Sequence, residues 1–456
     1  MIYNSKCQPV VEINMIRTFS IVISLFLFAA CGSDAPEPPA SEKSTADTQP
    51  TANSQPGLGA VAYVGANIWD GTGSATLRGA NMVVRDGRIE SVSTDEVPAG
   101  AEIVDLGGTW IVPGFINSHG HISGRWAAED VTGAAARAKE DLSLYARYGV
   151  TTITSLGGVP ADAFAIRDEN DSATLNHARL YVAGVVVNDR NVENTLDVME
   201  ANALQEVDWL KIQIDDRLGT AEKMSWDAVQ LAIDTGRSSE IPVAAHIYYM
   251  DDAARALQMG VGLIAHSVRD REVSDEFVQT LLNSGVCYVP TLMREVSAFT
   301  YSSRPDFFND PFFLANANKK EMARVSDADF MARMAASSSA TVYRQALVQA
   351  QDNLRILVGS GVPIAFGTDS GPGGRFPGYF EHEEFRLMAE AGMTPREILL
   401  SATSVAADCQ NYFDIGSLQA GKWADFVVLT EDPLADISAT RSLRSVYIAG
   451  NKIEVN

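Results

Sequence analysis

Short runs of apolar and β-branched residues recur through the middle of the chain, separated by stretches with helical spacing. Eight runs predict strands: Trp110–Asn117, Thr151–Leu156, Arg179–Val187, Trp209–Ile214, Pro242–Ile247, Gly262–Ser267, Cys287–Leu292 and Pro363–Thr368. Helix-like stretches such as Asp251–Met259 and Asp275–Asn283 follow most of them. This alternation is typical of parallel β/α architecture. The pattern predicts an α/β chain with a (β/α)8 TIM barrel, whose reactive residues gather at the carboxyl ends of the strands.

Shorter strand-like runs separated by turns flank this central part on both sides. On the N-terminal side these are Val61–Val64, Asn81–Val84 and Ile89–Val92, and on the C-terminal side Ala424–Leu429, Ser445–Ile448 and Lys452–Val455. Turn signals such as Asp86-Gly87 and Gly450-Asn451 separate them, as in small β-domains. We therefore expect a small β-domain beside the barrel.

One connection in the barrel pattern is unusually long. Residues 293–343 separate the seventh and eighth runs and carry Phe299, Tyr301, Phe307, Phe308, Phe312 and Phe313. Long connections inside compact domains are usually functional or disordered. A lid over the substrate and a subunit contact or helical decoration explain the aromatic residues equally well, so both interpretations stay open.

The N-terminal end has the pattern of an export signal. Ile21–Ala30 is an apolar run after Arg17, too short to span a membrane, and it leads through small residues into Cys31. This resembles a bacterial lipoprotein signal, which predicts a lipid on Cys31 and an anchored protein of the cell envelope, on the periplasmic side or in the outer membrane. Ordinary secretion is the alternative. Gly32–Gly57 is rich in Pro, Ser, Thr and Ala and predicts a flexible tether.

Charge and cysteine content exclude two classes of function. The formal net charge is −23 and the sequence pI is near 4.6, which argues against nucleic acid as a partner, because phosphate contacts need clustered Lys and Arg. The four cysteines, Cys7, Cys31, Cys287 and Cys409, have no CxxC or metal-finger spacing. Neither a disulfide scaffold nor a cysteine zinc site is therefore expected.

Four of the six histidines stand at the ends of strand-like runs, and these are His119, His121, His246 and His266. Residues two apart on a strand point to the same face, so the first two can enter one cavity. The segment GTDS, with Asp369, closes the eighth run. Imidazole and carboxylate ligands suit zinc and similar divalent metals. The pattern predicts a metal site, whereas His177 and His382 lack this context and are expected to be structural.

These motifs together resemble the amidohydrolase superfamily, over nearly all of the chain from about Gly57. The resemblance is carried by PGFINSHGH (Pro113–His121), His246, His266, GTDSG (Gly367–Gly371) and GSLQAGKWADFVVLTEDPL (Gly416–Leu434). It implies that the two ends of the chain pair into a small β-sandwich beside the barrel. The expected division is residues 1–31 as signal, 32–57 as linker, 58–109 and 413–456 as the β-sandwich, and 110–412 as the barrel.

The resemblance also gives Lys211 a role. It lies in WLKIQID, where many two-metal members carry a lysine carboxylated by CO2 that bridges the ions. A buried lysine loses its charge readily, and the neutral amine can attack CO2. We expect two divalent ions, zinc in the first instance, held by His119, His121, His246, His266, Asp369 and carboxylated Lys211. The alternative is a buried lysine paired with Asp215 or Asp216.

The expected reaction is hydrolysis of an amide bond of a small substrate, such as a dipeptide or N-acyl amino acid, by metal-activated water. Asp369 would act as general base and then general acid. Ester or lactone hydrolysis and a one-metal deaminase are alternatives, although deaminases of this superfamily resemble a pattern with Glu where this chain has Tyr249. A non-catalytic surface lipoprotein that binds a ligand is the alternative of another class.

The likeness is strongest to the Xaa-Pro dipeptidase and imidazolonepropionase group. An arginine near the strand ends could pair with a substrate carboxylate, so the candidate substrate contacts are Tyr248, Arg269, Arg271 and Arg375. The exact substrate, the number of metal ions and the formation of a homo-oligomer are left open by the sequence.

Overall fold

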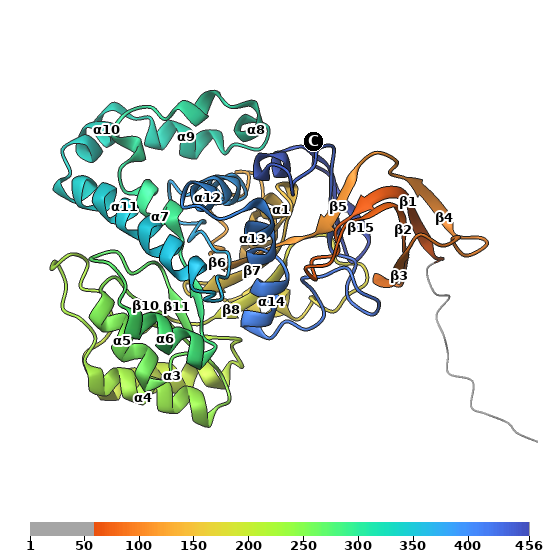
Figure 1. Cartoon of the computed structure of the whole chain (residues 1–456). Coiled ribbons are helices and arrows are strands. Elements are labelled where there is room, and N and C mark those ends of the chain that lie inside the picture. The colour runs from red at the N-terminus through yellow and green to blue at the C-terminus, as the bar shows by residue number, and fades with distance from the viewer. Residues whose placement is uncertain (1–58, 456) are drawn as a thin grey trace, which may run out of the picture. The chain divides into compact units, whose positions relative to one another are not determined.

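The computed structural model describes residues 59–455, so the predicted signal, Cys31 and the tether lie outside the described residues. The described part is an α/β structure with two parallel sheets, surrounding helices and one larger, mostly antiparallel sheet (Figure 1). Between residues 59 and 455, no helix is both long and apolar enough to cross a membrane.

The central strands form two parallel sheets. One contains β6 (Phe115–Gly120), β7 (Val150–Leu156) and β8 (Arg179–Ala183), and the other contains β9 (Leu210–Gln213), β10 (Val243–His246), β11 (Leu263–Ala265) and β12 (Cys287–Val289). Single parallel bridges continue the pairing beyond both sheets: Ala183 with Trp209, Val187 with Ile212, Tyr288 with Ile364, and Gly120 with Ser370. Seven of the predicted runs thus contain strands that lie parallel and in sequence order.

The first and eighth predicted runs differ from expectation. Trp110–Asn117 divides at Gly114, because β5 (Trp110–Pro113) pairs with strands of the terminal sheet while β6 pairs with β7. The run Pro363–Thr368 forms no regular strand and is held by the single bridges at Ile364 and Ser370. The prediction of a strand there is wrong, since this run bridges its neighbours at two points and forms no continuous ladder.

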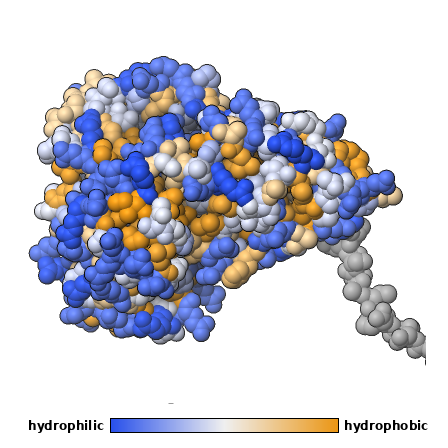
Figure 2. Space-filling model, in the orientation of Figure 1, coloured by the Kyte–Doolittle hydropathy of each residue, from blue (hydrophilic) through white to orange (hydrophobic). Residues whose placement is uncertain are grey.

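Helices follow the parallel strands and cover them. They are α1 (Ala134–Arg147), α2 (Ala163–Arg167), α3 (Val192–Leu204), α4 (Trp226–Ser238), α5 (Met250–Met259), α6 (Asp275–Ser284), α12 (Tyr379–Glu390), α13 (Pro395–Ser401) and α14 (Ser404–Gln410). Local sequence fixes several starts: the side chains of Ser225 and Ser274 accept backbone N–H groups of α4 and α6, and Thr394 forms a capping box with Glu397. The face of the molecule drawn in Figure 2 carries many hydrophilic residues with hydrophobic patches between them.

The strands from the two ends of the described chain share one eight-stranded sheet. They are β1 (Val61–Ile68), β2 (Leu77–Arg85), β3 (Arg88–Ser93), β4 (Glu102–Asp105), β5, β13 (Phe426–Leu429), β14 (Leu443–Ile448) and β15 (Asn451–Ile453). The order is β15-β14-β13-β5-β1-β2-β3, with β4 also paired to β1. The C-terminal strand β13 therefore lies between β14 and the N-terminal β5, and all four of its residues are buried.

The long connection after β12 folds into helices. These are α7 (Leu292–Ser297), α8 (Pro311–Leu314), α9 (Lys319–Val325), α10 (Ala328–Ala335) and α11 (Ser338–Gly359), with 3-10 turns η1 (Thr300–Ser302) and η2 (Asp306–Asn309). Phe308 and Phe313 stack on each other, and both pack edge-on against Phe376. The aromatic residues thus serve to attach the insertion to the segment that follows Asp369.

Two covalent or ionic links tie distant segments together. Cys287 of β12 and Cys409 of α14 form a disulfide, which the cysteine spacing did not predict because the two residues are 122 positions apart. It is the one disulfide within residues 59–455. Arg179 at the start of β8 forms a two-pronged ion pair with Asp425, with N–O distances of 2.6 and 2.9 Å, and both side chains are almost completely buried. This pair joins the parallel strands to the terminal sheet.

Candidate active site

The structure brings the four predicted histidines and Asp369 into one cluster. The ring centroid of His266 lies 4.6 Å from that of His119 and 4.1 Å from that of His246, and His119 lies 5.4 Å from His121. Ligand atoms of His119, His121 and Asp369 all lie within 4.8 Å of one another. Within the cluster, His246 and His266 come from the paired strands β10 and β11, and the segment after Phe366 returns next to β6, where the backbone N–H of Asp369 donates to the carbonyl oxygen of His119.

The contact between His121 and Asp369 is of a kind found where two side chains share a metal ion. His121 Nδ1 lies 3.0 Å from the carbonyl oxygen of Gly157, so this nitrogen carries the proton and donates. In a neutral imidazole the Nε2 atom is then an acceptor, yet it faces Asp369 Oδ1 at 2.8 Å. Two acceptors at this distance need a positive charge shared between them. A divalent cation fits that need, and a proton on the imidazole is the alternative.

The other histidines are oriented by similar partners. His246 Nε2 faces Asp215 Oδ2 at 3.2 Å, and His266 Nδ1 faces Thr291 Oγ1 at 2.8 Å. Each contact leaves the second ring nitrogen for a ligand, as in the carboxylate–histidine–metal arrangement. Burial lowers the pKa of His246 to about 3 and holds the pKa of His119 and His266 well below the usual value. Neutral imidazoles are the form that binds metal.

Lys211 is buried beside this cluster without a hydrogen-bond partner. Its side chain projects from β9, the residue is 3 % exposed, and Nζ has no partner among the described residues. Burial lowers the pKa of Lys211 to about 7. Asp215, the partner considered from the sequence, accepts from the backbone N–H of Arg217 and contacts His246 instead. His119 Nδ1 is a second buried atom without a partner. Such atoms fit a site that takes up a charged group.

The backbone around the cluster is held in unusual conformations. His266, Thr291 and Asp369 all have positive φ angles, of 74°, 49° and 57°, which residues with a Cβ rarely adopt. Gly371 also has a positive φ, and a Cβ there would lie 2.2 Å from the carbonyl oxygen of His121. Strain of this kind persists only where the surroundings impose it, and it concentrates at functional sites.

A buried polar network underneath fixes His119 and Asp369. One oxygen of Glu381, on α12, accepts from Asn117 Nδ2 at 2.6 Å, from Thr368 Oγ1 at 2.8 Å and from Ser370 Oγ at 2.5 Å. Asn117 in turn accepts the backbone N–H of His119, and the backbone N–H of Asp369 donates to the carbonyl oxygen of His119 at 2.6 Å. The sequence analysis missed this network, whose members are neither histidines nor strand-end carboxylates.

Asp369 is held in its ionised form by the groups around it. Burial alone raises its pKa, but Arg375 and the contact with His121 bring it well below the usual value, so the carboxylate is ionised. Arg375 Nη1 donates to Asp369 Oδ2, and its Nε donates to Ser297 Oγ at 3.0 Å. Arg375, predicted to contact substrate, is thus engaged with the proposed acid-base residue.

The remaining predicted substrate contacts need correction. The side chain of Arg269 is 0 % exposed, lies 2.9 Å from Glu295 and stacks 4.5 Å over the ring of Tyr248, so it cannot reach a ligand. Arg271 is half exposed and pairs with Asp251 at the start of α5, and no described contact joins it to the cluster. Tyr248 is buried, with the guanidinium of Arg269 over its ring.

Arg294 is the charged residue near the cluster that the sequence analysis missed. Its Nη1 lies 2.9 Å from Glu295 Oε1, and its side chain remains 12 % exposed. It was assigned to the long insertion, although it follows β12 by only five residues, and position after a strand end is the signal that could have found it.

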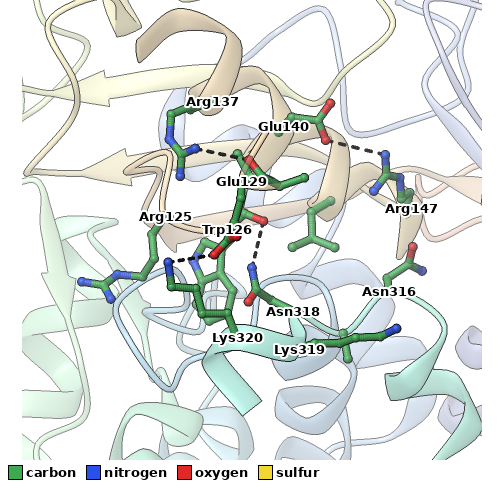
Figure 3. A pocket seen from close by; sticks show the side chains of 14 residues that line it. Arg125, Trp126, Glu129, Arg137, Glu140, Arg147, Asn316, Asn318, Lys319 and Lys320 are labelled. Atoms are coloured by element: carbon green, nitrogen blue, oxygen red, sulfur yellow. Dashed lines mark hydrogen bonds and ion pairs between the residues drawn. The ribbon is translucent and has the colours of Figure 1, made fainter. Parts of the chain in front are cut away.

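One cavity lies beside the cluster, not over it. It has a volume of about 660 Å³ and is lined by α1, the preceding loop and residues 316–320, with none of the predicted metal ligands (Figure 3). Its wall includes Trp126, whose Nε1 donates to the carbonyl oxygen of Gly371 at 2.7 Å. Asn318 Nδ2 donates to the carbonyl oxygen of Trp126 at 3.2 Å. The cavity is therefore bounded by side chains that hold the loop after Asp369.

The sequence profile described as the amidohydrolase family matches residues 110–453. An imidazolonepropionase of Desulfotalea psychrophila is 24 % identical over 402 residues, which cover 82 % of this chain and 91 % of that protein. An uncharacterised protein of Mycobacterium tuberculosis is 29 % identical over 222 residues, which cover 46 % of this chain and 56 % of that relative.

A solved structure of an Xaa-Pro dipeptidase with methionine bound in its active site superposes with a TM-score of 0.66 at 20 % identity, covering 87 % of this chain and 100 % of the other. At this level of identity the likeness speaks for a common fold. Membership in the amidohydrolase family rests on the match of the sequence profile over residues 110–453.

Proposed function

The chain belongs to the amidohydrolase family. On that premise we propose that it is a hydrolase of carbon–nitrogen bonds and that it cleaves an amide bond of a small substrate such as a dipeptide or an N-acyl amino acid. The observation that carries the proposal is the cluster of His119, His121 and Asp369, with its facing acceptor atoms 2.8 Å apart. The active site of an Xaa-Pro dipeptidase of similar fold holds methionine, which supports a substrate with amino acid character.

We also propose that the two parallel sheets belong to one closed barrel. The four single bridges support this, because they join β8 to β9, β12 to the segment of Ile364, and Ser370 back to β6. In such a barrel the carboxyl ends of the strands form the floor of the active site. His119, His246 and His266 stand at or next to such ends.

His119, His121 and Asp369, with His246 and His266, would hold divalent metal, for which zinc is the first expectation. Bound there, the metal would supply Lewis acidity that polarises the amide carbonyl and makes water a better nucleophile at neutral pH. Its fit to the site rests on the neutral buried imidazoles, the facing acceptors and the unpartnered Lys211 and His119 nitrogens.

The protein side of the reaction centres on Asp369. As an ionised carboxylate it can accept a proton from the attacking water at Oδ1 or Oδ2, and it can then deliver that proton to the amine that leaves. Arg375 orients the carboxylate and keeps it ionised between turnovers. The Glu381 network holds the backbone of Asp369 and His119 at fixed separation.

Lys211 is proposed to carry a carbamate. Its neutral amine would attack CO2, forming an N–C bond and releasing one proton, and the product would be a carboxylate group attached to Nζ. The proposal is supported by the enclosed Nζ without a partner beside His119, His246 and Asp369. A carboxylate there would complete a two-metal ligand set.

Asp369→Asn tests the proposed role directly. The amide is close in shape and can still accept from Arg375, but it cannot take up a proton, so turnover should fall about 10²- to 10⁴-fold. The assay uses metal-loaded protein and mixtures of dipeptides, N-acyl amino acids and simple lactones, with metal content measured on the same samples.

Asp432→Asn, in the loop after β13, is the matched control and should leave turnover unchanged. If Asp369→Asn retains metal and keeps near-normal turnover, the acid-base role belongs to another group. If wild type cleaves lactones or esters far faster than any amide, the proposed substrate class is wrong while the metal centre stands.

A further inference from the structure

Arg294 presents hydrogen-bond donors that no described residue takes up. A guanidinium has five N–H donors, and the only side-chain hydrogen bond of Arg294 within residues 59–455 joins Nη1 to Glu295 Oε1 at 2.9 Å. The side chain is 12 % exposed, so these donors are neither fully enclosed nor spread into solvent. The donors of a charged group in this state are open to an acceptor on a ligand.

The position of Arg294 on α7 places it close to the metal cluster. This helix begins three residues after β12 ends, at the carboxyl end of that strand. Thr291, the residue just before α7, has its Oγ1 2.8 Å from Nδ1 of His266. Arg294 follows that contact by three residues.

Two arginines share one carboxylate beside the cluster. Glu295 Oε1 lies 2.9 Å from both Arg269 Nε and Arg294 Nη1. The side chain of Arg269 is 0 % exposed and that of Arg294 is 12 % exposed, so of the two only Arg294 can reach a ligand.

The groups around Arg294 suit a carboxylate. The guanidinium lies 5.2 Å from the ring centroid of Tyr343 on α11, which gives it an aromatic wall. Tyr248 interacts electrostatically with Tyr343, and burial raises the pKa of Tyr248 to about 12, so its hydroxyl stays protonated and can donate. A guanidinium fork with a nearby hydroxyl is a receptor for a planar anion.

Glu384 fixes the helix that carries Arg294. Its two carboxylate oxygens accept the backbone N–H groups of Leu292 and Met293 at 2.7 Å each, and the residue is completely buried. Thr291, just before α7, is bonded to His266. The position of Arg294 is therefore tied through α7 to a member of the metal cluster.

We infer that Arg294 receives the free carboxylate of the substrate, and that the substrates are N-acyl amino acids or dipeptides with a free carboxyl terminus. Neutral amides, esters and lactones lack the group that this site is built to bind. The inference rests on the proposed function. It adds that the substrate carries a negative charge and that Arg294 binds the charged group. It also replaces Arg269, Arg271 and Arg375 in that role.

The test compares matched substrates that differ only in that charge. Metal-loaded wild type is assayed with a mixture of dipeptides and with the same dipeptides carrying a carboxyl-terminal amide. We expect kcat/KM to be at least about 30-fold higher for the free acids, mainly through KM. Arg294→Met, which keeps length but removes charge, should abolish this preference and leave the amidated substrates within about threefold of wild type.

Two further variants separate recognition from structure. Arg294→Lys keeps the charge without the fork and should retain a part of the preference. Arg271→Met, in the exposed pair with Asp251, is the matched control and should behave as wild type. Thermal unfolding of every variant is recorded beside the kinetics, because a purely structural arginine would lower stability and both substrate classes together.

The outcomes are distinct. Equal losses for acids and amides in Arg294→Met overturn the inference and leave the proposed function standing. So does a wild type that prefers the amidated dipeptides. A wild type that hydrolyses no carbon–nitrogen bond in either set overturns the proposed function, and the inference with it.

Discussion

The proposed carbamate depends on one nitrogen atom, Nζ of Lys211. Its Nζ is enclosed, lacks a partner and lies within electrostatic range of His119 and Asp369. A structural ion pair with Asp215 or Asp216 was the alternative from the sequence, and no described contact of that kind exists in residues 59–455. A carbamate remains the proposal that gives this nitrogen a chemical use.

Lys211→Ala should lower metal per chain and reduce turnover about 100-fold or more, since it removes an anionic ligand between cations. Acetate or propionate could occupy the vacated space and restore part of the rate. Metal content by elemental analysis and turnover with and without the acid are the measurements.

Lys223→Ala is the control, because Lys223 pairs with Asp252 outside the cluster. Full metal occupancy and ordinary turnover in Lys211→Ala, with no response to acid, would exclude the carbamate.

The metal cluster could be predicted residue by residue because ligand chemistry is visible in the sequence. His246 and His266 each end an apolar run, and in a parallel β/α architecture the carboxyl ends of the strands lie at the active site. The partners of those ligands could not be predicted. Glu381 reaches Asn117 from 264 positions away, and the choice of Arg294 over Arg269 depends on which side chain the packing encloses.

Among the elements, β12 and α14 are linked in a way that no helical or strand pattern reveals. Cys287 and Cys409 lie in an apolar cluster and form the disulfide across 122 residues. Disulfides persist in oxidising compartments, so this bond supports the proposed location in the cell envelope. The signal and Cys31 on which that proposal also depends lie outside the described residues.

Replacing both cysteines by alanine should lower the free energy of unfolding by about 2–5 kcal/mol, because a long loop gains freedom in the unfolded chain. Urea unfolding with and without a thiol reductant measures this. The reductant should destabilise wild type and leave the double variant unchanged. Two free thiols in wild type isolated under thiol-blocking conditions would contradict both the bond and the location it supports.

Strands and helices with strong periodicity were predicted well, and irregular segments were not. The ranges of α5 and α6 agree with the expected helices to within one residue. The run Pro363–Thr368 has the composition of a buried strand, but its backbone is held at only two bridges. The insertion became helical because Pro311, Asn318 and Asp327 provide helix starts that its aromatic content had obscured.

At the scale of the whole described molecule, Arg179 and Asp425 hold the parallel strands to the terminal sheet. Asp425 also accepts the backbone N–H of Ala449, and the guanidinium of Arg179 lies 4.6 Å from the ring centroid of Trp423. Arg88 packs on the same ring at 4.0 Å but is 37 % exposed. The two arginines therefore differ chiefly in that the ion pair of Arg179 is buried and the ion pair of Arg88 is exposed.

Arg179→Met should destabilise the protein by about 3–5 kcal/mol, because it leaves the Asp425 carboxylate buried without its partner. Arg88→Met, at the more exposed pair with Asp414, should cost about 1 kcal/mol or less. Chemical unfolding of both variants makes the comparison. Equal losses would mean that the ring contacts, not the buried ion pair, join the two parts.

The position of β13 has a consequence for how the chain is made. This strand is synthesised more than 300 residues after β5, yet it is the neighbour that β5 requires. Until the ribosome has released the last part of the protein, β5 has an open, apolar edge of the kind that recruits other chains. The native sheet can therefore form only after synthesis is nearly complete. A chain that stops after α14 would lack this neighbour, so premature termination late in translation should yield aggregates, not a shortened enzyme.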